Sequence, residues 1–300
     1  MEFPNFNPYI IGQTPAFQLF GLHVPPLGIR WYALSYILGI VLGWLYAGRL
    51  LKRDDLWGER GKPMSTTQLD DLVLWITLGV IVGGRLGGIL FYRLWDQSGQ
   101  PFSLLEVFQI WNGGMSFHGG LLGVIAAMVF FARTQKIPLF HVGDLVAPVV
   151  PIGLFFGRLA NFINGELWGR PTDLPWGMIF CNQRIEQMYP DGCPAGYYPR
   201  HPSQLYEAAL EGVLLFVVLR LATHRFGALK RPGLVSGMFL LGYGLIRALL
   251  EQVREPDLTM PEALRGFITM GMLLSLPMIA FGAWMVWKNR DLFRKSAPAA

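Results

Sequence analysis

The sequence predicts an all-α integral membrane protein, a single polytopic membrane domain over residues 1–300 with about seven transmembrane helices. Hydrophobic residues make up 52% of the chain and charged residues only 15%, whereas a soluble domain carries about 25% charged residues. Seven segments each supply the roughly 20 apolar residues that a spanning helix needs. The basic residues between these segments gather in alternate connections.

We expect spans over residues 29–51, 71–94, 118–134, 144–163, 204–222, 234–252 and 266–287. All six lysines lie after the first, third, fifth and seventh of them: Lys52, Lys62, Lys136, Lys230, Lys288 and Lys295. Cytoplasmic connections carry the excess of basic residues, so the N-terminus is expected outside and the C-terminus in the cytoplasm. The net charge of +5 therefore reflects topology, and no nucleic-acid partner is expected. No basic stretch precedes an apolar run at the N-terminus, so we expect no cleavable signal peptide.

The first predicted span begins with aromatic residues, and the second carries glycines along one helical face. Residues 1–27 are expected to lie on the outer membrane surface, and Tyr32 falls where an interfacial aromatic belt would sit. In the second span Gly79, Gly83 and Gly87 recur every four residues, a spacing that lets two helices approach closely. Packing alone accounts for these glycines. It does not account for Arg85, because a charge near mid-span costs about 2.5–3.5 kcal/mol unless it faces the bundle interior or a wet cavity.

His118 begins the third span between two pairs of glycines. A lone histidine is usually a polar residue whose hydrogen bonds are satisfied. The flanking glycines favour a functional role, because they remove side-chain bulk and let a ligand or backbone come close to the ring.

The fourth span ends in a polar segment, residues 157–169, which contains Arg158, Asn161, Glu166 and Gly169. The connection that follows, residues 164–203, is too long for a plain link, and we expect it to form a small periplasmic head or lid. Its two cysteines, Cys181 and Cys193, would pair in an oxidising compartment. The sequence favours two cysteines without a role over a disulfide, and it leaves their pairing open.

The sixth span places Tyr243, Arg247 and Glu251 on one helical face. An ion pair within that helix would account for the last two. Helix direction nevertheless brings these residues to the outer half of the membrane, together with Tyr32, Arg85, His118, Arg158 and Glu207. Structural ion pairs have no reason to collect in one leaflet, so we expect a site there.

The residue types at this site favour a phosphate-bearing ligand. Arg85, Arg158 and Arg247 supply planar forks that match phosphate, and Glu166, Glu207 and Glu251 would hold them. At this depth the available phosphate belongs to a phospholipid. His118 is the nearby base that titrates close to neutral pH. The five histidines are scattered and no metal-binding spacing occurs, so no metal is expected.

On these residues the sequence resembles the prolipoprotein diacylglyceryl transferase family. The most specific match is residues 157–169; residues 83–85, 115–120, 200–207 and 242–251 match in the expected order. Ala160 departs from the usual glycine of the family, a change between small residues. The resemblance implies transfer of the sn-1,2-diacylglyceryl group of phosphatidylglycerol to the lipobox cysteine of a prolipoprotein signal peptide. It also implies a bacterial inner-membrane enzyme, expected to act as a monomer without a cofactor.

The resemblance also suggests roles for the site residues. We expect His118 to take the thiol proton, with Tyr243 as the alternative, and Arg158 and Arg247 to stabilise the phosphate leaving group. Arg85 would contact the arriving lipid. The remaining candidates would position the headgroup, the lipid or the arginines: Tyr32, Asn161, Glu166, Gly169, Glu207 and Glu251.

Two other classes of protein also place polar residues inside a membrane. A transporter for an anionic solute would show broken helices and a midplane site, often with repeats, but no repeat is visible here. An intramembrane serine protease would need a serine and a histidine that meet across helices. Ser116 and His118 are only two residues apart. Both alternatives are therefore disfavoured.

Overall fold

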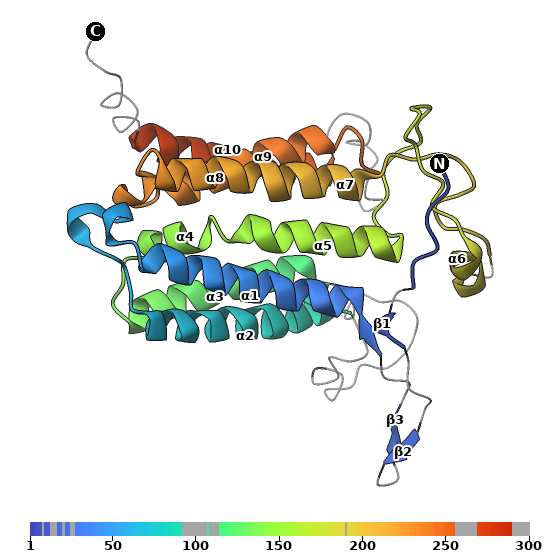
Figure 1. Cartoon of the computed structure of the whole chain (residues 1–300), viewed down its shortest axis with the longest axis horizontal. Coiled ribbons are helices and arrows are strands. Elements are labelled where there is room, and N and C mark those ends of the chain that lie inside the picture. Colours follow the sequence, from blue (N-terminus) through green and yellow to red (C-terminus); the bar gives the residue numbers. More distant parts are fainter. Residues whose placement is uncertain are drawn as a thin grey trace. The chain divides into compact units, whose positions relative to one another are not determined.

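The computed structural model describes residues 1–7, 9–12, 17–19, 22–24, 28–91, 107, 114–189, 191–255 and 269–289. Helices dominate these residues (Figure 1): α1 (Trp31–Leu51), α2 (Thr66–Phe91), α3 (Phe117–Thr134), α4 (Leu139–Val146), α5 (Val150–Asn164), α6 (Gln183–Met188), α7 (Ser203–Glu207), α8 (Leu215–His224), α9 (Leu234–Leu250) and α10 (Met270–Lys288). A π-helix, η6 (Ala208–Leu214), joins α7 to α8, and short 3-10 helices cover Asp54–Leu56, Gly58–Arg60 and Ala228–Lys230. Two antiparallel strand pairs precede α1: β1 (Tyr9–Ile11) with β4 (Ile29–Arg30), and β2 (Phe17–Leu19) with β3 (Leu22–Val24).

Every predicted span contains helix, and the chain is a multi-pass membrane protein. Among the described residues, α1, α2, α3 and α10 are each long and apolar enough to cross a membrane, and α4 with α5 makes a fifth candidate if the pair is one span. Residues 92–94 and 266–268 of the predicted spans lie outside the described residues. The count of seven spans and the orientation of the termini stay predictions.

The structure corrects the expectation of one uninterrupted helix over residues 144–163. Helix α4 ends at Val146 and α5 begins at Val150, with turns between them. Pro148 and Pro151 explain the break, because proline lacks an N–H donor and its ring clashes with the preceding helical turn. Pro151 lies in the first turn of α5, where proline is well tolerated.

The chain divides into two compact units, residues 1–45 with 147–300, and residues 46–146. In the second unit, α2 and α3 pack over the predicted glycines. A Cβ added to Gly83 would lie 2.8 Å from the Cα of Gly123, and one added to Gly87 would lie 2.5 Å from the Cα of Gly119. Backbone contact therefore replaces side-chain contact along this helix pair, as the spacing predicts.

In the first unit, one continuous helical run from Ser203 to His224 packs against α5 and α9. Its middle third is the π-helix η6, which the sequence pattern does not reveal. Helices α9 and α10 lie side by side (Figure 1), and Gly237 of α9 fits closely against Met285 of α10. This arrangement turns α5, α7 with η6, and α9 toward one another.

Residues 164–203 form a small core of their own with the start of the chain. Phe3 is buried against Phe180 and Ile185, and its N–H donates to the carbonyl of Ile179 at 3.1 Å. Cys181 and Cys193 are joined in a disulfide, with 5.6 Å between their Cα atoms. The structure thereby answers what the sequence leaves open. We call this region the head; its role as a periplasmic lid stays a prediction.

Candidate functional site

Six charged side chains from three helices meet inside the first unit. Arg158 comes from α5, Glu207 from the end of α7, and Glu211 from η6. Helix α9 and the turn after it supply Arg247, Glu251 and Arg254. We call these six residues the charge cluster: Arg158, Glu207, Glu211, Arg247, Glu251 and Arg254.

Glu207 is the centre of the charge cluster. Its Oε2 lies 3.1 Å from Nε of Arg158, and its Oε1 lies 3.5 Å from an Nη atom of Arg247 and also pairs with Arg254. Its side chain is fully buried. One buried carboxylate therefore holds three arginines, which is the grouping that the outer-half argument predicts for Arg158, Arg247 and Glu207.

Further carboxylates complete the pairing. Glu211 accepts two hydrogen bonds from Arg158, at 3.1 and 3.0 Å. Glu251 lies 2.6 Å from Arg247 and 3.6 Å from Arg254. The ion pair within α9 thus exists, as one part of a larger network. Three positive and three negative charges balance, as buried charges require.

The charge cluster is paired in charge but incomplete in hydrogen bonds. One oxygen each of Glu207, Glu211 and Glu251 and one Nη of Arg247 are buried without a hydrogen-bond partner among the described residues. The arginine side chains keep 13–16% of their surface exposed. The Nη of Arg247 is the one atom of these four unpartnered atoms that could donate to an anionic ligand. The oxygens of Glu207 and Glu251 instead face arginine nitrogens, at 3.1 and 2.6 Å.

The end of α5 is shaped by backbone geometry and amides. Gly165 takes the left-handed conformation at φ 72° and ends the helix, and Leu167 also has a positive φ of 59°. Asn161 and Asn164 donate to Oε1 of Glu166, at 2.8 and 3.2 Å. Among the described residues Glu166 therefore holds asparagines, and the expectation that it would hold an arginine is wrong.

Gly169 occupies a crossing of three chain segments. Its N–H donates to the carbonyl of His201 at 2.9 Å, and its backbone pairs with that of Arg254. An added Cβ would lie 2.7 Å from the Cβ of His201 and still closer to the carbonyl oxygen of Val253. Glycine is required there because no side chain fits.

The two tyrosine candidates are both in the first unit. Tyr243 lies on α9, where its ring stacks on Phe239. It is within electrostatic range of Arg158 and Glu211. Tyr32 forms a hydrogen bond with Tyr36, O to O 3.3 Å, and is also within electrostatic range of Arg158. Both therefore accompany the charge cluster.

His118 and Arg85 belong to the second unit. His118 is exposed in the first turn of α3, with its ring edge-on to Phe117 at 5.8 Å. The helix is capped by Ser116, whose hydroxyl accepts from the N–H of Gly119. Arg85 is buried, 8% exposed. That either residue acts with the charge cluster stays a prediction.

Glu211 and Arg254 are members of the charge cluster that the sequence analysis missed. A signal exists for each. Glu211 follows Glu207 by four residues inside an apolar span, and Arg254 follows Glu251 by three. At such spacings side chains of a helix are neighbours, so a search for charges on the same face would have found them.

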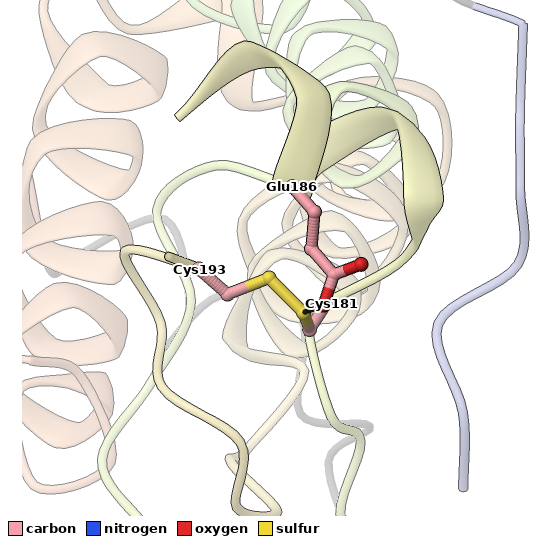
Figure 2. Close-up of side chains that lie close together, drawn as sticks. All are labelled: Cys181, Glu186 and Cys193. Carbon is pink, nitrogen blue, oxygen red and sulfur yellow. Dashed lines mark hydrogen bonds between the residues drawn. A yellow bond between two sulfur atoms is a disulfide. The ribbon is translucent and has the colours of Figure 1, made fainter. Parts of the chain in front are cut away.

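One group of side chains among the described residues has the geometry of a metal site, namely Cys181, Glu186 and Cys193 (Figure 2). Their ligand atoms all lie within 4.8 Å of one another. The two sulfurs are bonded to each other, so neither is available as the thiolate that binds metals. The group is therefore a disulfide beside a carboxylate.

The fold and the charge cluster define a multi-pass membrane protein with a buried, charge-balanced group of arginines and carboxylates. The family model for prolipoprotein diacylglyceryl transferase matches residues 19–288, and the chain belongs to this family. It is an enzyme, a transferase, which decides against the transporter and protease alternatives.

Close relatives support this assignment along the whole chain. A phosphatidylglycerol–prolipoprotein diacylglyceryl transferase of Caulobacter sp. (strain K31) is 56% identical over 293 residues, covering 96% of this chain and 94% of that protein. The protein of the same name from Caulobacter vibrioides (strain NA1000 / CB15N) is 55% identical over 100% of this chain and 99% of its own length. That of Phenylobacterium zucineum (strain HLK1) is 51% identical, over 100% and 97%.

Proposed function

We propose that this chain transfers the sn-1,2-diacylglyceryl group of phosphatidylglycerol to the lipobox cysteine thiol of prolipoproteins. The sulfur forms a bond to the sn-3 carbon of the diacylglycerol, the bond from that carbon to the phosphate oxygen breaks, and glycerol phosphate leaves with the electron pair. The thiol proton passes to a base. The products are a thioether-linked lipid and a phosphate monoester.

The observation that carries this proposal is the junction at Glu207. Because Glu207 is buried and paired with Arg158, Arg247 and Arg254, these guanidinium groups are fixed before a ligand arrives. Preorganised donors in a water-poor site stabilise a developing anion far better than mobile ones do. Their remaining exposed surface is where the lipid phosphate would bind.

A small, open apolar groove lies beside the charge cluster. It is lined by residues of α7, η6, the end of α9 and the following turn: Tyr206, Ala209, Leu210, Leu249, Leu250, Gln252 and Val253. Several of these are sequence neighbours of charge-cluster residues: Tyr206 precedes Glu207, and Val253 precedes Arg254. We propose that one acyl chain lies in this groove while the phosphate contacts the arginines.

The base and the accessory residues keep their predicted roles in this proposal. A thiolate is the reactive form of cysteine and a free thiol has a pKa near 8.5, so a base that titrates near neutral pH increases the rate. We assign that role to His118, with Tyr243 as the alternative. Asn161 and Glu166 hold the end of α5, Gly169 positions the loop that follows, Tyr32 orients the lipid, and Arg85 contacts the arriving headgroup.

The proposed setting is the bacterial inner membrane. Seven apolar segments of spanning length and the lysine pattern favour an outside N-terminus, a cytoplasmic C-terminus and a site toward the outer leaflet. Residues 164–203 would then cover it as a periplasmic lid. We propose that the enzyme acts as a monomer.

Transfer onto a peptide tests the proposal. The purified protein is incubated with phosphatidylglycerol and a lipobox peptide, and mass spectrometry should show a gain of one diacylglyceryl group. A peptide with serine in place of cysteine should gain nothing, because the hydroxyl is a much poorer nucleophile. Phosphatidylethanolamine, which has a zwitterionic headgroup, serves as the lipid control. Absence of the mass shift with the cysteine peptide would overturn the proposal.

A further inference from the structure

Arg200 is a buried arginine of the head with every contact directed at protein atoms. It is 6% exposed. Its Nε donates to the carbonyl of Ala195 at 2.5 Å, and its Nη atoms reach the carbonyl of Gly169 at 3.0 Å, the hydroxyl of Tyr198 at 2.6 Å and the carboxylate of Glu255 at 2.5 Å. Four of its five N–H groups are thus used within the protein. Its role must be exerted on the segments that it joins.

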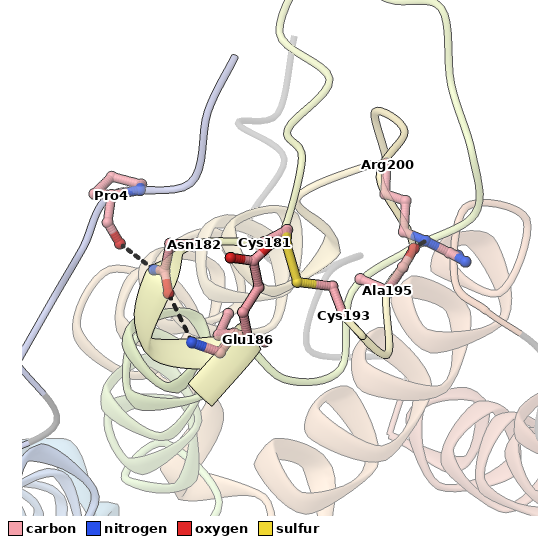
Figure 3. The surroundings of a disulfide bond; sticks show 8 residues. Pro4, Cys181, Asn182, Glu186, Cys193, Ala195 and Arg200 are labelled. Atoms are coloured by element: carbon pink, nitrogen blue, oxygen red, sulfur yellow. Dashed lines mark hydrogen bonds between the residues drawn. A yellow bond between two sulfur atoms is a disulfide. The ribbon is translucent and has the colours of Figure 1, made fainter. Parts of the chain in front are cut away.

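The first of these segments carries the disulfide. Ala195 is fully buried two residues after Cys193, and the N–H of Gly196 donates to the carbonyl of Cys193 at 2.8 Å. Figure 3 shows Arg200 reaching Ala195 on the same loop as the bridge between Cys193 and Cys181. A disulfide restricts the conformations of the loop it closes. The disulfide thus helps to hold in place the carbonyl of Ala195, which accepts the hydrogen bond from Nε of Arg200.

The second segment leads to the charge cluster. The backbone of Gly169, whose carbonyl accepts from Arg200, pairs with that of Arg254. The next residue, Arg170, donates its N–H to Val253 at 2.8 Å and its side-chain Nε to the carbonyl of Arg254, also at 2.8 Å. The guanidinium of Arg254 then pairs with Glu207 and Glu251.

We propose that Arg200 is a positioning residue that fixes Arg254 for the lipid phosphate through Gly169 and Arg170, with the disulfide holding the other end of this connection. The inference rests on the proposed function, because it assumes that the arginines of the charge cluster bind the phosphate. It predicts that disturbing Arg200 changes the affinity for phosphatidylglycerol by way of Arg254. Arg158 and Arg247 are held from helices α5 and α9 and meet Arg254 only through the carboxylates that they share with it.

A double-mutant cycle tests the connection. Arg200→Lys keeps the charge but gives up the planar fork that reaches Ala195 and Gly169 together. We expect it to raise the KM for phosphatidylglycerol by about tenfold, within the range seen for coupled neighbours, with a smaller change in kcat. In an Arg254→Lys background the same change should add about twofold or less. In an Arg247→Lys background a clearly larger share of the factor should persist, because Arg247 meets Arg254 only through Glu207 and Glu251.

The outcomes separate the inference from the function it rests on. Equal effects of Arg200→Lys in both backgrounds, or no change in KM, would overturn the inference while a wild-type protein that transfers lipid upholds the function. A wild-type protein that neither binds phosphatidylglycerol nor transfers it would overturn the function itself. Where turnover falls below detection, phosphatidylglycerol binding measured by native mass spectrometry completes the cycle.

A second variant guards against a simple folding failure of Arg200→Lys. Cys181→Ser with Cys193→Ser leaves Arg200 in place and releases only the loop that contains Ala195. We expect a rise in KM in the same direction but smaller, again reduced in the Arg254→Lys background. A rise in KM of the same size in the Arg254→Lys and Arg247→Lys backgrounds would show that the disulfide stabilises the head without acting on Arg254, and would overturn the proposed connection.

Discussion

In the second unit, α2 and α3 approach each other over glycines, whereas in the first unit α5, η6 and α9 present charged side chains to one another. A Cβ on Gly83 would lie 2.8 Å from the Cα of Gly123, so α2 and α3 are in close backbone contact. Helices α5, α7 and α9 meet instead through Arg158, Glu207 and Arg247, whose side chains are at most 16% exposed.

The difference shows that close packing of two helices in this protein can rest on small residues. Dispersion contacts between small residues are sufficient for α2 and α3, and buried charges inside a membrane segment are expensive and are generally functional. We therefore propose that the charge cluster serves binding rather than packing. The first three predictions below test that division of roles.

The largest effect is expected from Arg158→Ala. Without this guanidinium the leaving phosphate loses a preorganised donor, so transfer should fall by at least about 10²–10³-fold while membrane insertion is retained. The variant also leaves Glu211 buried without its partner, which destabilises the fold. Adding Glu211→Gln should recover thermal stability but not transfer, as judged by melting and by the peptide mass shift. Wild-type turnover in Arg158→Ala would refute the assignment of Arg158 as a phosphate ligand.

A smaller loss, about 10²-fold, is expected from His118→Gln, in line with the loss of a general base. This prediction asks whether the glycine-packed pair α2–α3 also contributes chemistry. The rate should be measured across pH, because a lost base removes its own limb of the profile. An unchanged rate and profile would make the histidine structural and Tyr243 the preferred proton acceptor.

Packing without charge is tested by Gly83→Ala. The new methyl group would press on the backbone of Gly119 and Gly123, and overpacking of this kind costs about 1–3 kcal/mol. Gly120→Ala is the matched control on the facing helix, because its Cβ would find Val80 O at an ordinary 3.7 Å. Thermal melting in detergent should show a loss for Gly83→Ala alone. Equal melting temperatures would mean that α2 and α3 are not in close contact.

The smallest effect concerns His201, a titratable group just outside the charge cluster. Burial lowers the pKa of His201 below its usual value, near 6.5. The unfolded chain therefore takes up a proton at a higher pH than the folded protein does. The stability that His201 contributes is present above about pH 6.5 and declines as the pH falls below it. His201→Gln should weaken this decline slightly, as seen by comparing melting temperatures at several pH values. A variant with the same pH dependence as the wild type would assign the decline to other groups.

Much of the fold could be predicted because apolar length and charge placement are local properties of the sequence. The predicted span 29–51 agrees with α1 to within two residues at its start, and Arg158, Glu207, Arg247 and Glu251 were correctly expected to gather. The break at Pro148 was missed because hydropathy counts proline as tolerable in a long apolar run. The Cys181–Cys193 pairing and the partners of Glu166 depend on the path of a long loop, which no short-range pattern specifies.

Because η6 is a π-helix, the number of residues in its segment affects how the helices on either side of it are oriented. A π turn contains one residue more than an α turn, because its hydrogen bonds run from i to i+5. Adding one residue in Ala208–Leu214 would rotate Glu207 about the helix axis relative to Leu215–His224, whereas removing one apolar residue would let the run close as a regular α-helix. A single-residue insertion there should therefore be more damaging than a single-residue deletion, and transfer activity compared between the two kinds of variant would reveal it.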